Sequence, residues 1–254
     1  ASCLVGSEMC IRDRNKRYKQ ICYLCGKKLS RGSSNRTVDH IPPRGFFPEN
    51  FDRKVNLPTV LCCRKCNNSY ARLDEEFRFL LSSGNYRSKA GDWIWNNKSE
   101  PKIGKSLINF CADLVRGFRG YEILQMEDSF SQAVNITVSY TEKILPFFSR
   151  LAKGFLVYDS HNYKNYDFVV FPLYNYPEIY NIMMKYPDKR SFLDDNGEHI
   201  FSYVYQHDQK FDKGFFFFSF YKDQHFGVLF ERSIYTSTSE KKILDDIIKK
   251  WNIY

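Results

Sequence analysis

The sequence lacks any apolar run of the roughly 18 to 20 residues that a helix needs to cross a bilayer. Its most aromatic stretch, Gly214–Tyr221, is only as long as a strand. It also lacks internal repeats, low-complexity tracts and the continuous apolar core of a secretory signal peptide. These absences favour a soluble protein with no membrane partner. Hydrophobic residues nevertheless make up 43% of the chain, which is enough for a folded core.

The first 14 residues stand apart from the rest. The stretch Cys3–Arg14, CLVGSEMCIRDR, is similar to the translation of a transposase-type sequencing adapter. We therefore expect residues 1–14 to be an artefact that derives from an adapter in assembled environmental DNA. Cys3 and Cys10 would then carry no chemistry. The alternative is a genuine N-terminal tail.

Positive charge is concentrated in one part of the chain. The net charge is +9, but residues 15–90 contain 16 Lys and Arg against 6 Asp and Glu, a net charge of +10. Residues 91–254 contain 20 Lys and Arg against 21 Asp and Glu, a net charge of −1. Such a concentration favours a polyanionic partner, most simply nucleic acid. A basic surface that serves only solubility is the alternative.

The cysteines cluster in the same segment. Cys22 and Cys25 form one CxxC pair, and Cys63 and Cys66 form another after an interval of 37 residues. Two such pairs are typical of a zinc site in which four thiolates close the coordination shell, so the ion has a structural role. Cys62 is an alternative ligand, but Cys63 has the better spacing. This use of cysteine differs from a disulfide framework and suggests a reducing, cytoplasmic compartment.

The apolar periodicity predicts an α+β protein with a small zinc-stapled module over residues 15–83 and a larger mixed α+β domain over residues 103–254. Residues 84–102 show little periodicity and are interpreted as a linker. In the module we expect strands over 37–41 and 55–61 and a helix over 64–81. In the larger domain we expect helices over 103–118, 141–153 and 240–253 and strands over 155–158, 168–173, 200–205, 214–221 and 226–230.

A set of motifs lies between and beside the CxxC pairs. It begins with Val38-Asp39-His40-Ile41-Pro42-Pro43, continues with Asn56-Leu57, and ends with Asn67 directly after the second pair. This order resembles the HNH endonucleases of the ββα-metal class. The resemblance covers residues 21–83 and implies a hydrolase that cuts the phosphodiester bonds of DNA. The module alone does not exclude RNA as the substrate.

The resemblance assigns roles by position. His40 matches the general base, a neutral imidazole that takes a proton from the attacking water. Asp39 matches a carboxylate ligand of the catalytic divalent cation, and Asn67 matches a second ligand. Oxygen ligands favour Mg²⁺ or Mn²⁺ over softer ions. Asn56 matches the asparagine that constrains the loop and helps to orient the base.

Basic residues near these motifs are expected to contact phosphate groups of the nucleic acid. Such contacts give affinity without a choice of sequence. The residues are Arg36, Arg44, Arg64 and Lys65.

Three acids, Asp74, Glu75 and Glu76, follow on the predicted helix 64–81. The simplest interpretation is a solvated helix face that pairs with Arg72 or Arg78. As an alternative, one of the acids assists the metal ion.

The larger domain shows no catalytic signature. Cys111 lies on an apolar helical stripe and is interpreted as a core thiol. His161, His199, His207 and His225 are interpreted as surface or packing residues. The domain is either a folding partner that restricts access to DNA or a sensor that binds a protein partner or an effector.

A catalytically silent, zinc-stapled nucleic-acid-binding module is the main alternative to a nuclease. The combination of Asp39 and His40 with Asn67 argues against it, because a binding module needs none of these residues. A remnant of a gene that has lost its function is a further alternative.

Overall fold

The computed structural model describes residues 20–49, 51, 57–84, 86–105, 107–110, 122–123, 134–135, 144–160, 164–173, 181, 185–194 and 196–232. The predictions for residues 1–14, Asn56, Cys111, His161 and the helix 240–253 lie outside these residues. Within them, no helix combines the length and the apolar character that crossing a membrane requires.

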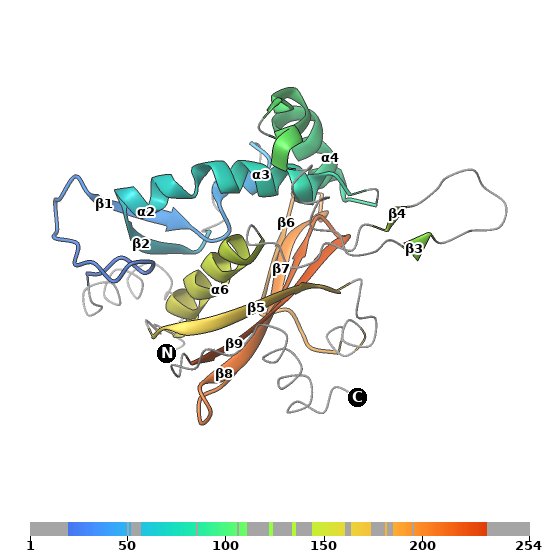
Figure 1. Cartoon of the computed structure of the whole chain (residues 1–254). Coiled ribbons are helices and arrows are strands. Elements are labelled where there is room, and N and C mark those ends of the chain that lie inside the picture. Colours follow the sequence, from blue (N-terminus) through green and yellow to red (C-terminus); the bar gives the residue numbers. More distant parts are fainter. Residues whose placement is uncertain are drawn as a thin grey trace, which may run out of the picture.

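The protein has a mixed α+β structure (Figure 1). The first half contains β1 (Arg36–His40), η1 (Arg44–Phe46), β2 (Thr59–Cys63), α2 (Arg64–Ser69), α3 (Ala71–Ser82), α4 (Lys89–Ile94), η2 (Trp95–Ser99) and η3 (Glu100–Lys102). The second half contains β3 (Glu122–Ile123), β4 (Val134–Asn135), α6 (Ile144–Ser160), β5 (Tyr166–Pro172), β6 (Arg190–Leu193), β7 (His199–Asp208), β8 (Lys213–Phe220) and β9 (Gln224–Arg232). The strands form the pairs β1-β2 and β3-β4 and a five-stranded antiparallel sheet in the order β5-β9-β8-β7-β6.

A β-hairpin precedes the first helices. Strands β1 and β2 pair antiparallel, so that Asp39 lies opposite Val60 and Arg36 lies opposite Cys63. Both strands fall within a few residues of their predicted positions. Because α2 starts directly after β2, the hairpin and the helix are joined without a loop.

The helix predicted over 64–81 is divided into two. Tyr70, with φ of −95° and ψ of −7°, ends α2 and starts α3. Next to it, Ser69 Oγ donates to the Cys66 carbonyl at 2.8 Å. Such a local side-chain bond competes with regular helix geometry. Tyr70 therefore separates α2 from α3.

The five-stranded sheet contains four of the predicted strands, in β5, β7, β8 and β9, and one that was not predicted, β6. The strand predicted over 155–158 is wrong, because these residues form the last turns of α6. Their aromatic and β-branched side chains favour a strand. However, Phe148, Leu151 and Phe155 recur at helical spacing and are fully buried, so packing of one helix face decides the outcome.

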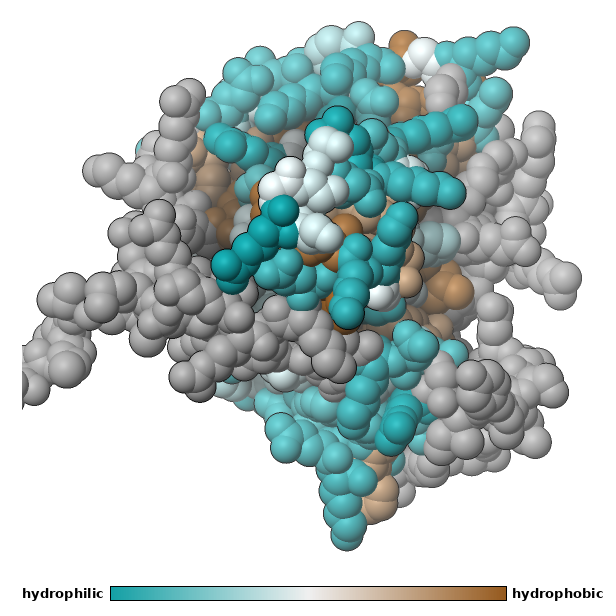
Figure 2. Space-filling model, turned by 90° about the vertical axis from the view of Figure 1, so that its left-hand side faces the viewer, coloured by the Kyte–Doolittle hydropathy of each residue, from teal (hydrophilic) through white to brown (hydrophobic). Residues whose placement is uncertain are grey.

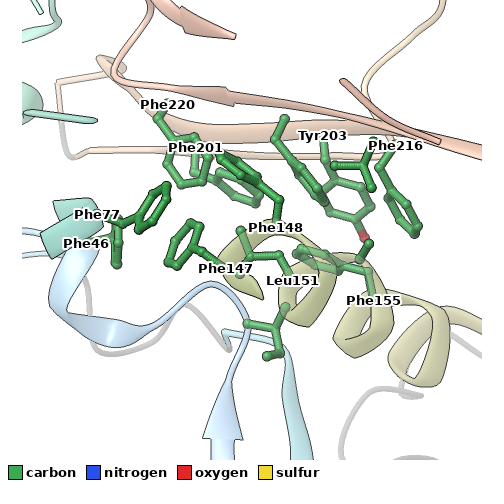
Figure 3. Packing of buried hydrophobic residues seen from close by; sticks show 14 of the residues in the cluster. Phe46, Phe77, Phe147, Phe148, Leu151, Phe155, Phe201, Tyr203, Phe216 and Phe220 are labelled. Atoms are coloured by element: carbon green, nitrogen blue, oxygen red, sulfur yellow. The ribbon is translucent and has the colours of Figure 1, made fainter. Parts of the chain in front are cut away.

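Helix α6 lies between the hairpin and the five-stranded sheet (Figure 1). On the sheet side, the ring centroids of Phe155 and Tyr203 are 4.0 Å apart. On the other side, Phe147 stacks on Phe77 of α3 with centroids 4.2 Å apart. Figure 3 shows these side chains in one continuous cluster. The predicted module and the predicted larger domain therefore share a hydrophobic core.

Residues 84–102, predicted to be a linker, are packed into this core. They form α4, η2 and η3, in which Ile94 and Ser99 are buried. A Cβ atom at Gly91 would lie 2.8 Å from Cβ of Tyr221, so α4 lies directly against the end of β8. The segment shows little periodicity because its three helical turns differ in type and are too short for a repeating stripe.

Candidate metal centre and adjoining pocket

The first CxxC pair lies on a tight turn of the chain. Gly26 has φ of 73°, a left-handed conformation that favours glycine. Its amide donates to the carbonyl of Cys22 at 2.9 Å and closes the turn. The amide of Tyr23 donates to the carbonyl of Leu61 at 3.0 Å. This bond fixes the turn against β2, next to the second pair.

The second CxxC pair spans the junction of β2 and α2. Cys63 caps the helix, since its Sγ accepts from the amide of Cys66 at 3.4 Å. The Sγ atoms of Cys22, Cys25, Cys63 and Cys66 all lie within 4.8 Å of one another. Thiolates at about 2.3 Å from a tetrahedral zinc ion would be about 3.8 Å apart, and Cys25 and Cys63 are separated by 3.9 Å. The four predicted ligands could therefore hold a metal ion such as zinc.

Cys62 is fully buried and lies beside this cluster. Its Sγ is 3.8 Å from Sγ of Cys22. Their hydrogen bond lowers the pKa of the Cys22 thiol to about 3 and raises the pKa of the Cys62 thiol. Cys62 is therefore a hydrogen-bond partner of Cys22, while Cys63 completes the group of four cysteines.

A pocket of about 240 Å³ opens at the end of β1. Asp39 and His40 line it together with Arg44 of η1 and Asn67 of α2. Adjacent residues of a regular strand face opposite sides. Asp39 and His40 nevertheless meet in one pocket because His40 is the last residue of β1. Four of the residues predicted from sequence are thus brought together.

The other predicted phosphate contacts do not line this pocket. Arg36 is opposite Cys63 at the far end of β1, about 13 Å from His40 along the strand. Arg64 and Lys65 are exposed at the start of α2. Each of these three basic residues is adjacent to a cysteine of the cluster, Arg36 through the strand register and Arg64 and Lys65 along the chain.

His40 is half-buried in the pocket wall. Burial lowers its pKa from the ordinary value of 6.5, and the charge of Arg44 lowers it further, against an opposing effect of Asp39. The imidazole therefore favours its neutral form, which is the form that a general base requires.

Arg150 of α6 was not predicted to belong to the site. Its side chain is 1% exposed. Nη2 donates to Asp39 Oδ1 at 2.7 Å, and Nε donates to Asp39 Oδ2 at 3.0 Å. Tyr23 Oη donates to the same Oδ2 at 2.6 Å. One sequence signal could have pointed to this residue, since Arg150 is the single arginine within the apolar run ILPFFSRLAKGFLV. Arginine is almost never fully buried unless it is paired, so an arginine in a buried helix implies a carboxylate partner.

Arg150 also joins the hairpin to α3. Its Nη1 donates to Asp74 Oδ1, and its guanidinium lies 4.6 Å from the ring centroid of Tyr70. Burial raises the pKa of Asp74 to about 6, against the lowering effect of Arg150. Asp74 is the second acid that lines the pocket.

The interpretation of Asp74 as part of a solvated helix face is wrong. Arg72 and Arg78 pair instead with Glu76 and Glu75. The face of α3 that carries Asp74 is turned toward α6, where a buried cation requires a negative partner.

The described histidines outside the pocket belong to the five-stranded sheet. His199 Nε2 lies 3.0 Å from Ser202 Oγ, and His225 Nδ1 lies 2.9 Å from Ser219 Oγ. His207 lies 3.5 Å from Asp212. These contacts fit the packing role predicted for them.

Comparison with known proteins identifies no relative. No protein family, curated protein or solved structure matches the chain. Its function is therefore inferred from the pocket and the cysteine cluster themselves.

Proposed function

We propose that this protein is a metal-dependent endonuclease of the HNH type, built on a ββα-metal module. The observation that carries the proposal is that Asp39, His40 and Asn67 line one pocket. They come from β1 and α2 in the order of the HNH motifs. The paired strands β1 and β2, followed directly by α2, agree with the expected module, and the cysteine cluster lies where hairpin and helix join.

In the proposed reaction, His40 accepts a proton from a water molecule as the water oxygen attacks the phosphorus atom. The bond between phosphorus and the 3′-oxygen breaks, and the leaving 3′-oxygen takes a proton from solvent. The products are a 5′-phosphate and a 3′-hydroxyl. The half-buried position of His40 beside Arg44 keeps the ring neutral and ready to accept the proton. Arg44 supplies positive charge to the phosphate.

The pocket offers the oxygen donors that Mg²⁺ and Mn²⁺ prefer. Asp39, Asn67 and Asp74 would hold the ion, which would stabilise the charge on the leaving oxygen. A carboxylate has about four lone-pair sites. Asp39 accepts three hydrogen bonds from Tyr23 and Arg150, so one site on Oδ1 stays open for an ion.

DNA is the substrate that we expect. The face of the molecule that carries the hairpin is mainly hydrophilic where it is coloured in Figure 2. Lys27, Lys28, Arg64 and Lys65 are exposed in this part of the chain. They would bind phosphate groups without reading the bases. RNA carries the same charge, so both nucleic acids belong in the test.

A catalytically silent nucleic-acid-binding module is the second candidate, and one observation favours it. Arg150 and Tyr23 enclose the Asp39 carboxylate and use most of its acceptor capacity. In a binding module this ion pair would serve only to join α6 to the hairpin.

Nicking of supercoiled plasmid by the full chain separates the two candidates. The reaction is run with Mg²⁺, with Mn²⁺ and with EDTA, and zinc content is measured after each treatment. We expect cleavage that requires the divalent cation and is lost in His40→Ala and Asn67→Ala. Asn68→Ala is the matched control, because Asn68 is the exposed neighbour of Asn67 and does not line the pocket.

Binding of DNA without cleavage under any metal condition would support the silent module. A structured RNA is tested in parallel. Cleavage of the RNA in preference to the plasmid would retain the nuclease and change its substrate.

A further inference from the structure

Two arginines line the pocket from different elements. Arg44 comes from η1 and Arg78 from α3. A Cβ atom at Gly45 would lie 3.2 Å from Nη1 of Arg78. The guanidinium of Arg78 therefore lies against η1, which carries Arg44, in the lining of the pocket that also contains His40.

The guanidinium of Arg78 is only loosely held within the protein. Nη2 reaches the carbonyl of Lys98 at 3.4 Å and Glu75 Oε1 at 3.5 Å, both at the long limit of a hydrogen bond. Nε is buried and has no hydrogen-bond partner among the described residues. The side chain is 12% exposed. A cation buried to this extent with unused donors is costly unless a ligand supplies acceptors.

Neither acid that lines the pocket, Asp39 or Asp74, forms an ion pair with Arg44 or Arg78. Asp39 and Asp74 both bind Arg150, on the side of the pocket wall that faces α6. No carboxylate of the described residues forms an ion pair with Arg44. Among the same carboxylates, Arg78 reaches only Glu75, at 3.5 Å, and shares that carboxylate with Lys102. The charge of Arg78 is therefore only partly neutralised, and that of Arg44 is available to an anion.

The pKa of the neighbouring Lys98 is lowered in part by the same positive charges. Burial is the main cause that lowers its pKa, and the charges of Arg78 and Arg44 lower it further, although Glu49 opposes them. Lys98 Nζ donates to the carbonyl of Phe47 at 3.0 Å. This edge of the pocket is thus electropositive beyond the two arginines alone.

We propose that Arg44 and Arg78 form a subsite that binds the phosphate group of the substrate beside His40. The identity of the substrate rests on the proposed nuclease function. The chemistry of the subsite is general, because the planar fork of a guanidinium matches two oxygens of a phosphate. A phosphate held there places its phosphorus atom next to the general base, and it satisfies donors that the protein leaves unused.

Inorganic phosphate is the probe for this subsite. It is titrated into the full chain without added divalent cation, and the ring resonance of His40 is followed by NMR. We expect a saturable shift in the wild type and binding that is weaker by about tenfold or more in Arg78→Gln. Arg72→Gln is the matched control, since Arg72 lies on the same helix but is 73% exposed and pairs with Glu76.

Two further variants guard against a folding defect in Arg78→Gln. Arg78→Lys keeps the charge without the fork and is expected to bind with intermediate affinity. Arg44→Gln alters an exposed side chain, and it is expected to weaken phosphate binding while leaving the unfolding midpoint unchanged.

Equal phosphate affinity of Arg78→Gln and Arg72→Gln would overturn the proposal, as would the absence of any phosphate-dependent shift in the folded wild type. Plasmid cleavage separates this proposal from the nuclease. If phosphate binds through Arg78 but no divalent cation supports cleavage, the subsite stands and the nuclease fails. If Arg78→Gln cleaves at the wild-type rate, the nuclease stands and the subsite fails.

Discussion

The guanidinium of Arg150 binds both carboxylate oxygens of Asp39, through Nη2 at 2.7 Å and through Nε at 3.0 Å. The two residues are 111 positions apart in the sequence. Their side chains are 1% and 5% exposed. The pocket therefore depends on α6, a helix from the part of the chain that the sequence assigned to a separate domain.

Loss of Arg150 should destabilise the whole protein. Arg150→Met leaves Asp39 buried without its cation, which is expected to cost about 3–5 kcal/mol of unfolding free energy. Arg72→Met is the control, because the Arg72 side chain is 73% exposed and its pair with Glu76 is expected to contribute only about 1 kcal/mol. Urea unfolding measures the free energy of unfolding of both variants. Similar losses in the two variants would contradict a buried ion pair.

The cysteine cluster should bind one zinc ion per chain. Cys25→Ser and Cys66→Ser remove a ligand and are expected to lose the metal and to lower the unfolding midpoint. Cys62→Ser changes a cysteine outside the group of four and leaves a hydroxyl that can still form a hydrogen bond with Cys22, so it is expected to retain the metal. Metal analysis of dialysed, folded protein is the measurement. Folded wild-type protein without zinc, or equal loss from Cys62→Ser, would reject the assignment of ligands.

Close packing of α6 on the hairpin should make Gly154 intolerant of a side chain. A Cβ atom there would lie 2.7 Å from Cγ1 of Ile41, which is fully buried. Gly154→Ala is expected to destabilise by about 1–3 kcal/mol through overpacking, although alanine by itself favours a helix by about 1 kcal/mol. Gly104→Ala, whose Cβ would meet no atom closer than 3.9 Å, is the neutral control in urea unfolding. A more stable Gly154→Ala would show that α6 and the hairpin are not in contact.

Stability should fall in mild acid because of His199. Burial, with a smaller effect of His225, lowers the pKa of His199 from 6.5 to about 4. The unfolded chain therefore binds more protons between these values. The stabilising contribution is complete above pH 6.5 and is lost as the pH falls toward 4. We expect a loss of roughly 1–2 kcal/mol between about pH 7 and 5.

His199→Gln provides the comparison for this pH dependence. Its unfolding free energy is expected to change less with pH than that of the wild type, with a residual slope because the pKa of His225 is also lowered by burial. Release of metal at low pH affects both proteins equally and cancels in the difference. Parallel pH profiles of variant and wild type would contradict the expectation.

DNA binding should weaken steeply with salt. A protein with several phosphate contacts loses about 10³- to 10⁵-fold in affinity between about 50 and 200 mM salt. Arg64→Gln and Lys65→Gln are each expected to reduce the slope by about one, whereas Lys210→Gln, at the end of the five-stranded sheet, should leave it unchanged. Fluorescence anisotropy with labelled DNA measures the slopes. A flat response to salt would argue against a phosphate-binding face.

Short stretches of the sequence determined much of the local chemistry. Spacing alone grouped Cys22 with Cys25 and Cys63 with Cys66, and the structure brings the four together. The order of the motifs grouped Asp39, His40 and Asn67, and these three residues line one pocket. These predictions needed only residues a few positions apart, or a repeated pattern with a known spacing.

The tertiary structure alone decided what surrounds those residues. Residues 155–158 form a helix because one face of α6 packs on the sheet, although their side chains favour strands. Asp74 faces inward because Arg150 lies opposite it, and Asp39 is enclosed by the same guanidinium. Local periodicity can show that a face is apolar, but it carries no information about which distant segment covers that face. The partner of a buried charge is therefore set by long-range packing, where desolvation makes an unpaired charge too costly.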